Sequence, residues 1–192
     1  MLNKKAAMFG LDARIALAIF GALSVISGAA LYSAIQDAKI TALLADFQEI
    51  NKGIESYYID TGLDLEQFKL ADLVSSTQSG WKGPYVNYPT NPLDTNQLLY
   101  KNLPTTVMYV TRYSDDPFVN SATQVLCSSS NNCYSWLAFA EKIADDEVQE
   151  TWRKLSERVD GNTDLLTGKV RMLVHSTYRY FYIQAMPVQE QI

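Results

Sequence analysis

The sequence is poor in the side chains that bind transition metals or act as general bases. It contains two cysteines and one histidine in 192 residues, and these residues do not have the spacing of a zinc site. No serine or cysteine motif that would indicate a nucleophile accompanies the single histidine, His175. We therefore expect no zinc centre and no enzyme activity, and we interpret His175 as a surface or structural residue.

Basic residues are outnumbered by acidic ones. The chain has 16 Lys and Arg against 21 Asp and Glu, which gives a formal net charge of −5. Because proteins neutralise nucleic-acid phosphates with clustered Lys and Arg, we predict no specific nucleic-acid site. Hydrophobic residues make up 47% and charged residues 19% of the chain, which excludes wholesale disorder and allows one sizeable core with an appendage.

A long apolar run follows a short basic start. Lys4 and Lys5 precede the run from Ile15 to Tyr32, in which Ser24 and Ser27 are the only polar side chains before Tyr32. About 18 such residues are at the lower limit for a helix that crosses a bilayer, and the positive-inside rule keeps the basic start in the cytoplasm. The run is rich in small residues, which allow helices to approach closely in lipid. We predict a membrane helix that packs against partner helices.

Three interpretations of this segment compete. It is a secretory signal with a loose cleavage site at Ser27–Ala30, a plain membrane anchor, or the first half of one long helix. The third interpretation rests on the apolar residues that continue at steps of three, four and seven, without Pro or Gly from Ser33 to Lys52: Ile35, Leu43, Phe47, Ile50, Ile54 and Tyr57. We therefore predict one long N-terminal helix over residues 8–61, with a membrane-embedded half at about 13–34 and Gly62 as its stop.

The start of this helix is similar to a family pattern. Ala18-Ile19-Phe20-Gly21-Ala22-Leu23 resembles the Ala-Ile-Ile-Gly-Ile-Leu sequence of type IV pilins and type II secretion pseudopilins. The resemblance implies a leader over residues 1–7, which a prepilin peptidase removes by cutting between Ala7 and Met8, so that Asp12 becomes the fifth mature residue. The family usually has Gly before the cut, Phe after it and Glu at the fifth position. A cut between Gly10 and Leu11 restores the Gly but leaves no acid at the fifth position.

Asp12 is a candidate assembly residue on physical grounds as well. A carboxylate at the edge of a hydrocarbon segment is costly to bury unless it is paired. In a bundle of identical helices, Asp12 of one chain pairs with the free α-amino group of the next. Two simpler interpretations stay open: Arg14 partly neutralises Asp12, or both residues lie among the lipid headgroups.

A second resemblance follows the predicted helix. Residues 55–62 (ESYYIDTG), 80–86 (GWKGPYV) and 89–94 (PTNPLD) are similar to the Tyr-Tyr-x-Asp-x-Gly, Trp-x-Gly-Pro-Tyr and Asp-Pro-Trp-Gly segments of major pseudopilins, in the same order. The third match is the weakest. Gly and Pro in these segments predict a packed connecting loop over 62–105, with Trp81 and Tyr85 filling its underside.

The rest of the chain, within residues 62–192, predicts a globular α/β head. Strands are expected at 107–112, 124–127 and 134–139, a long bent strand or hairpin at 169–183, and a helix at 141–159 that stops at Gly161. Residues 159–164 and 167–171 resemble the Asp-Gly turn and Thr-Gly-x-Val-Arg strand start of many pilins. The predicted fold class is α+β: a long N-terminal helix, packed on a small antiparallel-sheet head.

Cys127 and Cys133 enclose five polar residues. This gap is wrong for a Cys-x-x-Cys redox centre and suits a disulfide that closes a turn in an exported domain. Two free thiols, or bonds to other chains, are the alternatives.

Three oxygen-bearing side chains occupy the first, third and fifth positions of a calcium-loop spacing. They are Asp160, Asn162 and Asp164, but Arg171 stands where an EF-hand has its bidentate Glu. We favour a solvated turn and expect no cofactor, although the family resemblance leaves calcium as a minor alternative. Asp115 and Asp116 are weaker candidates.

Taken together, the resemblances imply a structural subunit of a type IV pilus or related filament. They imply a homopolymer that first lies in the inner membrane as a single-pass protein with a periplasmic head, and then at the cell surface in the pilus. The partners implied are a prepilin peptidase, an assembly ATPase and an inner-membrane platform protein. The alternatives are a pseudopilin of a type II secretion system and a monomeric, membrane-anchored periplasmic binding or adhesion domain.

Overall fold

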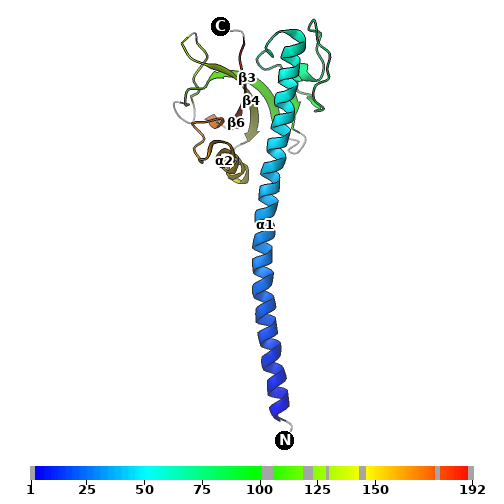
Figure 1. Cartoon of the computed structure of the whole chain (residues 1–192), viewed down its shortest axis with the longest axis vertical. Coiled ribbons are helices and arrows are strands. Elements are labelled where there is room, and N and C mark those ends of the chain that lie inside the picture. The colour runs from blue at the N-terminus through cyan, green and yellow to red at the C-terminus, as the bar shows by residue number, and fades with distance from the viewer. Residues whose placement is uncertain are drawn as a thin grey trace. The chain divides into compact units, whose positions relative to one another are not determined.

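The chain forms one long helix followed by a mixed head. The computed structural model describes residues 3–100, 106–118, 123–128, 130–142, 146–175 and 178–189, without the side chains of 3–9, 11, 142, 146 and 147. Its elements are α1 (Asn3–Thr61), a 3-10 helix η1 (Leu70–Leu73), β1 (Thr90–Asn91), β2 (Asp94–Leu99), β3 (Val107–Ser114), β4 (Cys133–Lys142), α2 (Asp146–Asp160), β5 (Val170–His175) and β6 (Tyr178–Pro187) (Figure 1). The predicted α+β fold class, a long apolar helix packed on an antiparallel sheet, is therefore confirmed.

Helix α1 runs without interruption over 59 residues. It ends where predicted, because Gly62 has a φ of +72° and its N–H donates to the carbonyl of Tyr58 at 2.7 Å. A left-handed glycine that closes such a bond is a common helix stop. The chain divides into two compact units, residues 1–42 and 43–192, so the last turns of α1 belong to the head.

The head is built on one six-stranded antiparallel sheet. Its strand order is β1-β2-β3-β4-β6-β5. The central pair places Val107 opposite Ala140 and Ser114 opposite Cys133, so the strands predicted at 107–112 and 134–139 are confirmed. The predicted element at 169–183 is a hairpin, in which β5 pairs with β6 from Val170 opposite Ile183 to His175 opposite Tyr178.

The two faces of the sheet carry separate aromatic clusters. On one face, Phe47 of α1 packs edge-on against Phe139 of β4 with ring centroids 5.2 Å apart. Trp152 of α2 stacks on Phe181 of β6 on the same face at 4.8 Å. The other face holds a buried cluster made of Tyr109, Tyr113, Phe118, Trp136, Ala138, Leu173 and Tyr182. Large apolar side chains on both faces make the sheet the centre of the core.

Three predicted boundaries differ from the structure. The predicted loop over 62–105 also contains η1 and the strands β1 and β2, whose residues Leu98 and Leu99 pair with Met108 and Val107. The strand predicted at 124–127 does not form, although the carbonyl of Val125 accepts from the Ser114 N–H and that of Leu126 accepts from the Asn131 side-chain amide. The helix predicted from Glu141 begins at Asp146, because Glu141 extends β4 opposite Arg179. Part of the predicted helix, residues 143–145, lies outside the described residues.

The predicted disulfide is present. Cys127 and Cys133 are bonded with their Cα atoms 5.3 Å apart. The bond closes the polar turn that leads into β4, where Ser128 N–H donates to Asn131 Oδ1 at 2.8 Å. The free-thiol and intermolecular alternatives are therefore not adopted in this chain.

A buried arginine ties the start of β5 to the end of β3. The Arg171 side chain is only 2% exposed, and its guanidinium donates to the carbonyls of Gly168 at 2.8 Å and Asp116 at 2.6 Å and to that of Asp115. It lies 4.5 Å from the ring centroid of Trp136. Burial lowers the pKa of this guanidinium, and nearby carboxylates oppose that shift.

We expect Arg171→Ala to lower the free energy of unfolding of the head by about 3 kcal/mol, because it leaves buried carbonyls without donors. Urea unfolding of the full chain in detergent, followed by tryptophan fluorescence, measures this. Arg153→Ala, at an exposed position of α2, is the control and should change stability by less than about 0.5 kcal/mol. Equal effects of the two variants would contradict this role of Arg171.

Candidate functional site

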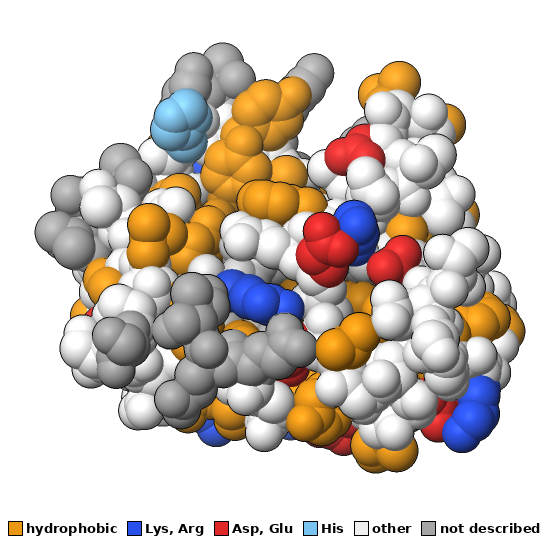
Figure 2. All heavy atoms as spheres, turned by 90° about the horizontal axis from the view of Figure 1, so that it is seen from above, with side chains coloured by type: hydrophobic (Ala, Val, Ile, Leu, Met, Phe, Trp, Pro, Cys, Tyr) orange, Lys and Arg blue, Asp and Glu red, His pale blue; other side chains and the backbone are white. Residues whose placement is uncertain are grey.

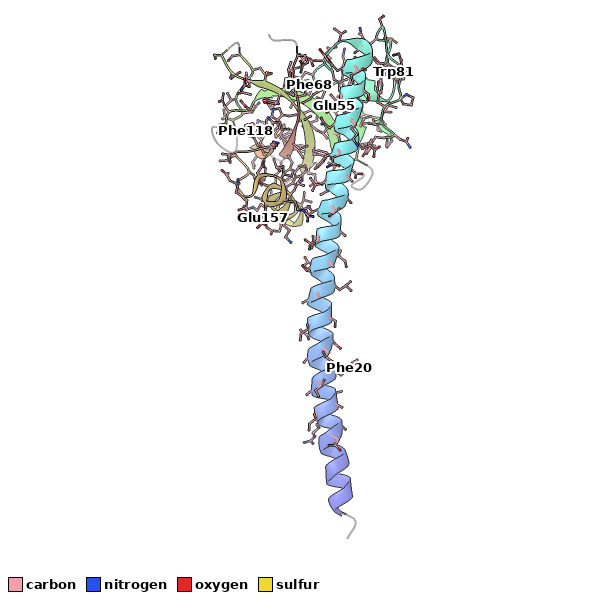
Figure 3. All side chains as sticks on the ribbon, in the orientation of Figure 1. Phe20, Glu55, Phe68, Trp81, Phe118 and Glu157 are labelled. Carbon is pink, nitrogen blue, oxygen red and sulfur yellow. A yellow bond between two sulfur atoms is a disulfide. The ribbon has the colours of Figure 1, made fainter. Side chains whose placement is uncertain are left out.

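The first half of α1 exposes an unusual amount of apolar surface. From Asp12 to Ile35 every side chain is exposed, including Leu17 (73%), Phe20 (70%) and Val25 (74%) (Figure 3). The Asp12–Thr61 part of the helix is long and apolar enough to cross a membrane, by length and composition. Since monomeric soluble proteins rarely expose large contiguous apolar patches, this segment is built to be covered by something outside the chain.

Several small residues share one side of this segment. At 100° per residue, Ala18, Gly21, Ala22, Gly28 and Ala29 fall within one sector of the helix, which also contains Val25. Ile19, Leu23 and Ile26 fall outside this sector, together with Ala16 and Ala30. A Cβ atom added at Gly21 or Gly28 would meet nothing within 4 Å, so the chain's own packing does not require glycine there. Close approach of a second helix is a physical reason for glycine at such positions.

Asp12 lies where the apolar segment begins. Its side chain is exposed, and the residues four, seven and eleven positions after it are Ala16, Ile19 and Leu23, so it lies on a side of the helix that carries both small and large residues. Arg14 is two positions away and points to another side of the helix, because residues at i and i+2 do not face each other. Helix geometry thus disfavours neutralisation of Asp12 by Arg14 within one chain.

The predicted cleavage positions lie inside α1. The backbone of Ala7, Met8, Gly10 and Leu11 is helical. The side chains of Ala7, Met8 and Leu11 lie outside the described residues. The choice between the two cuts stays a prediction.

The structure brings together two of the turn-rich segments that carry the family resemblance. Asp60, near the end of α1, accepts from Lys82 Nζ at 3.0 Å and from the Tyr85 hydroxyl at 3.0 Å. Gly80 has a φ of +87°, and a Cβ atom there would lie 2.4 Å from the carbonyl oxygen of Asp60. Only glycine therefore fits at this contact between the helix end and the loop.

Trp81 and Tyr85 pack the loop as predicted. The Trp81 indole N–H donates to the carbonyl of Asp72 at 2.9 Å. The Tyr85 ring lies edge-on to Tyr57 of α1 with centroids 6.2 Å apart, and to Trp81 at 5.8 Å. The peptide bond between Gly83 and Pro84 is cis. Neither aromatic side chain needs a ligand to explain its position.

The three calcium candidates hold a turn together. Asp160 accepts from the N–H groups of Lys169 at 2.8 Å and Val170 at 2.9 Å. Asn162 accepts from the Asp164 N–H at 2.9 Å, and Asp164 accepts from Leu166 N–H at 2.9 Å and the Thr167 hydroxyl at 3.0 Å. Among the residues that the structure describes, no group of three or more His, Cys, Asp or Glu is placed to hold a metal ion.

The remaining candidates are surface or loop residues. His175 is exposed at the end of β5, as interpreted from the sequence. The carbonyls of Asp115 and Asp116 accept from buried Arg171. On the face drawn in Figure 2, basic side chains are scattered beside acidic and hydrophobic ones.

The sequence did not predict the contacts that Arg171 makes with backbone carbonyls or the contact that Lys82 makes with Asp60. Both make contacts that span long stretches of the chain, so local patterns do not reveal them. The signal that pointed toward each was the motif that contains it, Thr-Gly-x-Val-Arg for Arg171 and Trp-x-Gly-Pro-Tyr for Lys82.

Comparison with known proteins found no matching family model, no matching curated protein and no matching solved structure. The resemblance to pilins therefore stays a prediction from the residues quoted.

Acid should weaken the contact between the helix end and the loop. Hydrogen bonds from Lys82 and Tyr85 hold the pKa of Asp60 below its ordinary value of 3.8. A group with a lowered folded pKa stabilises the fold above its unfolded pKa and loses that contribution as the pH falls through the folded value. We expect the free energy of unfolding of the wild type to decrease at pH values below about 4. The Asp60→Asn variant should show a smaller decrease, because it lacks the carboxylate that becomes protonated.

Urea midpoints of the full chain in detergent across the acid range measure this dependence. Glu157→Gln, at an exposed carboxylate on α2 (Figure 3), is the control and should keep the wild-type pH profile. If Asp60→Asn and the wild type lose stability over the same pH range by the same amount, the contact does not carry the effect.

Proposed function

We propose that the chain is a structural subunit of a type IV pilus or related filament, which a prepilin peptidase cleaves and which polymerises through the first half of α1. The observation that carries this proposal is the apolar segment from Asp12 to Ile35, whose side chains are all exposed in the single chain. Leaving one large aliphatic or aromatic side chain in water costs about 1.5–3 kcal/mol, so this segment must be covered, first by lipid and then by neighbouring copies. The step from lipid to neighbouring copies is favoured by close helix packing and by pairing of polar groups.

The small residues on one side of the segment favour a polymer over a plain anchor. A single anchor surrounded by lipid gains nothing from Gly21 and Gly28, since glycine weakens an isolated helix by about 1 kcal/mol relative to alanine. A helix that packs against identical helices uses both glycines for close approach. A monomeric, anchored binding or adhesion domain is thus the less favoured function.

Asp12 sets the register of the polymer in this proposal. Cleavage between Ala7 and Met8 creates a charged α-amino group four positions before Asp12. When a new subunit leaves the bilayer and joins the bundle, its amine pairs with Asp12 of a neighbour, so that neither charge is buried alone. The membrane holds the subunit before assembly, with the head periplasmic, and an ATPase and an inner-membrane platform protein drive its extraction.

A pseudopilin of a type II secretion system uses the same subunit chemistry. The third turn-rich segment departs from the major pseudopilin pattern at Asn91-Pro92-Leu93-Asp94. The disulfide Cys127–Cys133 suits an oxidising location. The departure at this segment favours the surface pilus as the first assignment, while the disulfide fits both candidates because the periplasm is oxidising too.

Shearing of cells that express the full chain tests the proposal. We expect sheared filaments whose subunit, by intact mass spectrometry, begins at Met8. A filament subunit that begins at Leu11 would replace the cleavage site and remove Asp12 from the fifth position. An uncut monomer in the membrane fraction would overturn the function itself.

We expect Asp12→Asn to lower the yield of sheared filaments at least about tenfold, because an unpaired amine in the bundle costs several kcal/mol and 1.4 kcal/mol is tenfold. Asp37→Asn changes an exposed acid on the same helix beyond the apolar segment and should leave the yield unchanged. Immunoblots of the sheared and membrane fractions measure both. Equal yields for Asp12→Asn and the wild type would remove Asp12 from the mechanism.

A further inference from the structure

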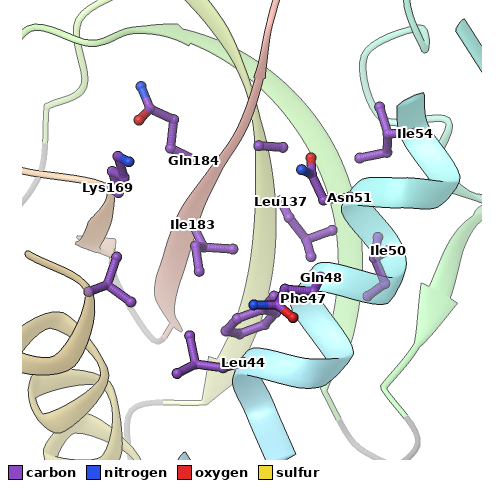
Figure 4. Close-up of a pocket in the computed structure, with 12 residues that line it drawn as sticks. Leu44, Phe47, Gln48, Ile50, Asn51, Ile54, Leu137, Lys169, Ile183 and Gln184 are labelled. Atoms are coloured by element: carbon purple, nitrogen blue, oxygen red, sulfur yellow. The ribbon is translucent and has the colours of Figure 1, made fainter. Parts of the chain in front are cut away.

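The head contains a groove that its own side chains do not fill. It lies between residues 44–54 of α1 and strand β6 and encloses about 270 Å³ (Figure 4). Its floor includes the buried side chains of Phe47, Leu137 and Ile183, and its polar rim includes Gln48 and Gln184. An apolar floor with a polar rim is the usual make-up of a binding groove.

Two polar groups at this groove favour a particular kind of occupant. The side-chain carbonyl of Asn51 is buried without a hydrogen-bond partner. Lys169 is exposed at the rim, and among the described residues no ion pair or side-chain hydrogen bond involves its ammonium. The groove therefore suits an apolar group with an adjacent anion and a hydrogen-bond donor.

The same chain presents an apolar group with an adjacent anion at the turn between β1 and β2, which we name the Leu93 turn (residues 91–94). Leu93 is 94% exposed, and Asp94 follows it directly in the sequence. A lone exposed leucine is ordinary, but this one is held in place. The buried Asn91 accepts from the Leu93 N–H at 3.1 Å and donates to Gln97 at 3.1 Å, and Asp94 accepts from the Asn96 N–H at 3.1 Å. A turn ordered in this way loses little conformational entropy on binding.

The turn and the groove belong to different sides of the head. In Figure 1 the segment that follows α1, drawn in teal and green, lies on one side of the last turns of α1, and α2 lies on the other. The groove includes Val159 of α2 and residues of β6. A contact between the two features therefore joins two copies of the chain. It joins unlike surfaces, and such head-to-tail contacts propagate into open helical filaments when the rotation does not close a ring.

We propose that the Leu93 turn of one copy docks into this groove on a neighbouring copy, with Leu93 on the apolar floor and the Asp94 carboxylate at the Lys169 ammonium. This contact rests on the proposed function, because it requires a polymer. The polymer would then have a second interface, between heads, in addition to the helix bundle. This interface would favour identical subunits as neighbours.

Cysteine cross-linking in sheared filaments of the full chain tests the contact. The native cysteines are bonded to each other, so a chain with Leu93→Cys and Gln48→Cys adds the only two reactive thiols. Mild oxidation should then produce a ladder of covalent dimers, trimers and longer species on non-reducing gels. The control pairs Gln48→Cys with Ile59→Cys, at a position that is 78% exposed on α1, and should give no ladder.

A double-mutant cycle provides the second measurement. Asp94→Asn removes the charge but keeps a side-chain oxygen that can accept from the Asn96 N–H. Asp94→Asn and Lys169→Gln should each lower the yield of sheared filaments about two- to fivefold, and the double variant should lower it no further than either single variant. Filaments of normal yield without the ladder, or losses of the two single variants that multiply in the double variant, would overturn the contact and leave the proposed function intact. Absence of filaments from the wild-type chain would overturn both.

Discussion

The burial of apolar helix surface is the interaction on which the molecule depends. From Asp12 to Ile35 the single chain leaves these side chains exposed, and water is the least favourable environment for them. Lipid covers them in one state of the proposed cycle, and identical helices cover them in the other. For an apolar side chain, lipid and a neighbouring helix differ only in dispersion and packing. Polar groups and small residues therefore decide which of the two environments the helix prefers. In the proposed filament, an acid at the edge of the segment and glycines along one side supply that discrimination.

The same helix also builds the head. Phe47, Ile50 and Ile54, in its later turns, are 5%, 0% and 1% exposed, and Phe47 packs against Phe139 and Trp152. The Tyr100 hydroxyl donates to the largely buried Asp46 at 2.7 Å, and Asp60 anchors the loop that follows the helix end through Lys82 and Tyr85. One continuous helix thus carries the exposed apolar segment and part of the core of the head. In the proposed polymer, this helix would join the packing surface of the subunit to its head.

Much of this fold was predictable because it depends on local patterns. The apolar periodicity up to Tyr57 and the glycine at position 62 predicted where α1 ends, and β-branched and aromatic runs predicted β3 and β4. The spacing of Cys127 and Cys133 predicted their bond. The strand β2 was missed because its residues 94–97, DTNQ, have no strand-like alternation, and it forms by pairing with β1 on one side and with β3 on the other. Residues 124–127 have strand-like composition but find no full partner, and α2 starts late because β4 extends through Lys142.

The candidate sites also divide into those with a local sequence signal and those formed by residues far apart in the sequence. Asp12 is a candidate from the family resemblance and from its place at the edge of an apolar run, both local signals, and its role stays a prediction. The joining of Asp60 to Lys82, the burial of Arg171 and the groove beside β6 each require residues far apart in sequence, so no periodicity or spacing announces them. The calcium spacing at 160–164 shows the converse, since a local pattern matched while the structure uses those oxygens to accept backbone N–H groups.

A spin label at the centre of the exposed segment gives the most direct measurement of the central claim. Because both native cysteines are bonded, Phe20→Cys takes a single nitroxide per chain. In sheared filaments, helices packed about 8–10 Å apart should bring labels close enough for strong dipolar broadening of the electron paramagnetic resonance spectrum, which dilution with unlabelled subunits removes. A spectrum without broadening, unchanged by dilution, would contradict the burial of this segment against copies of itself.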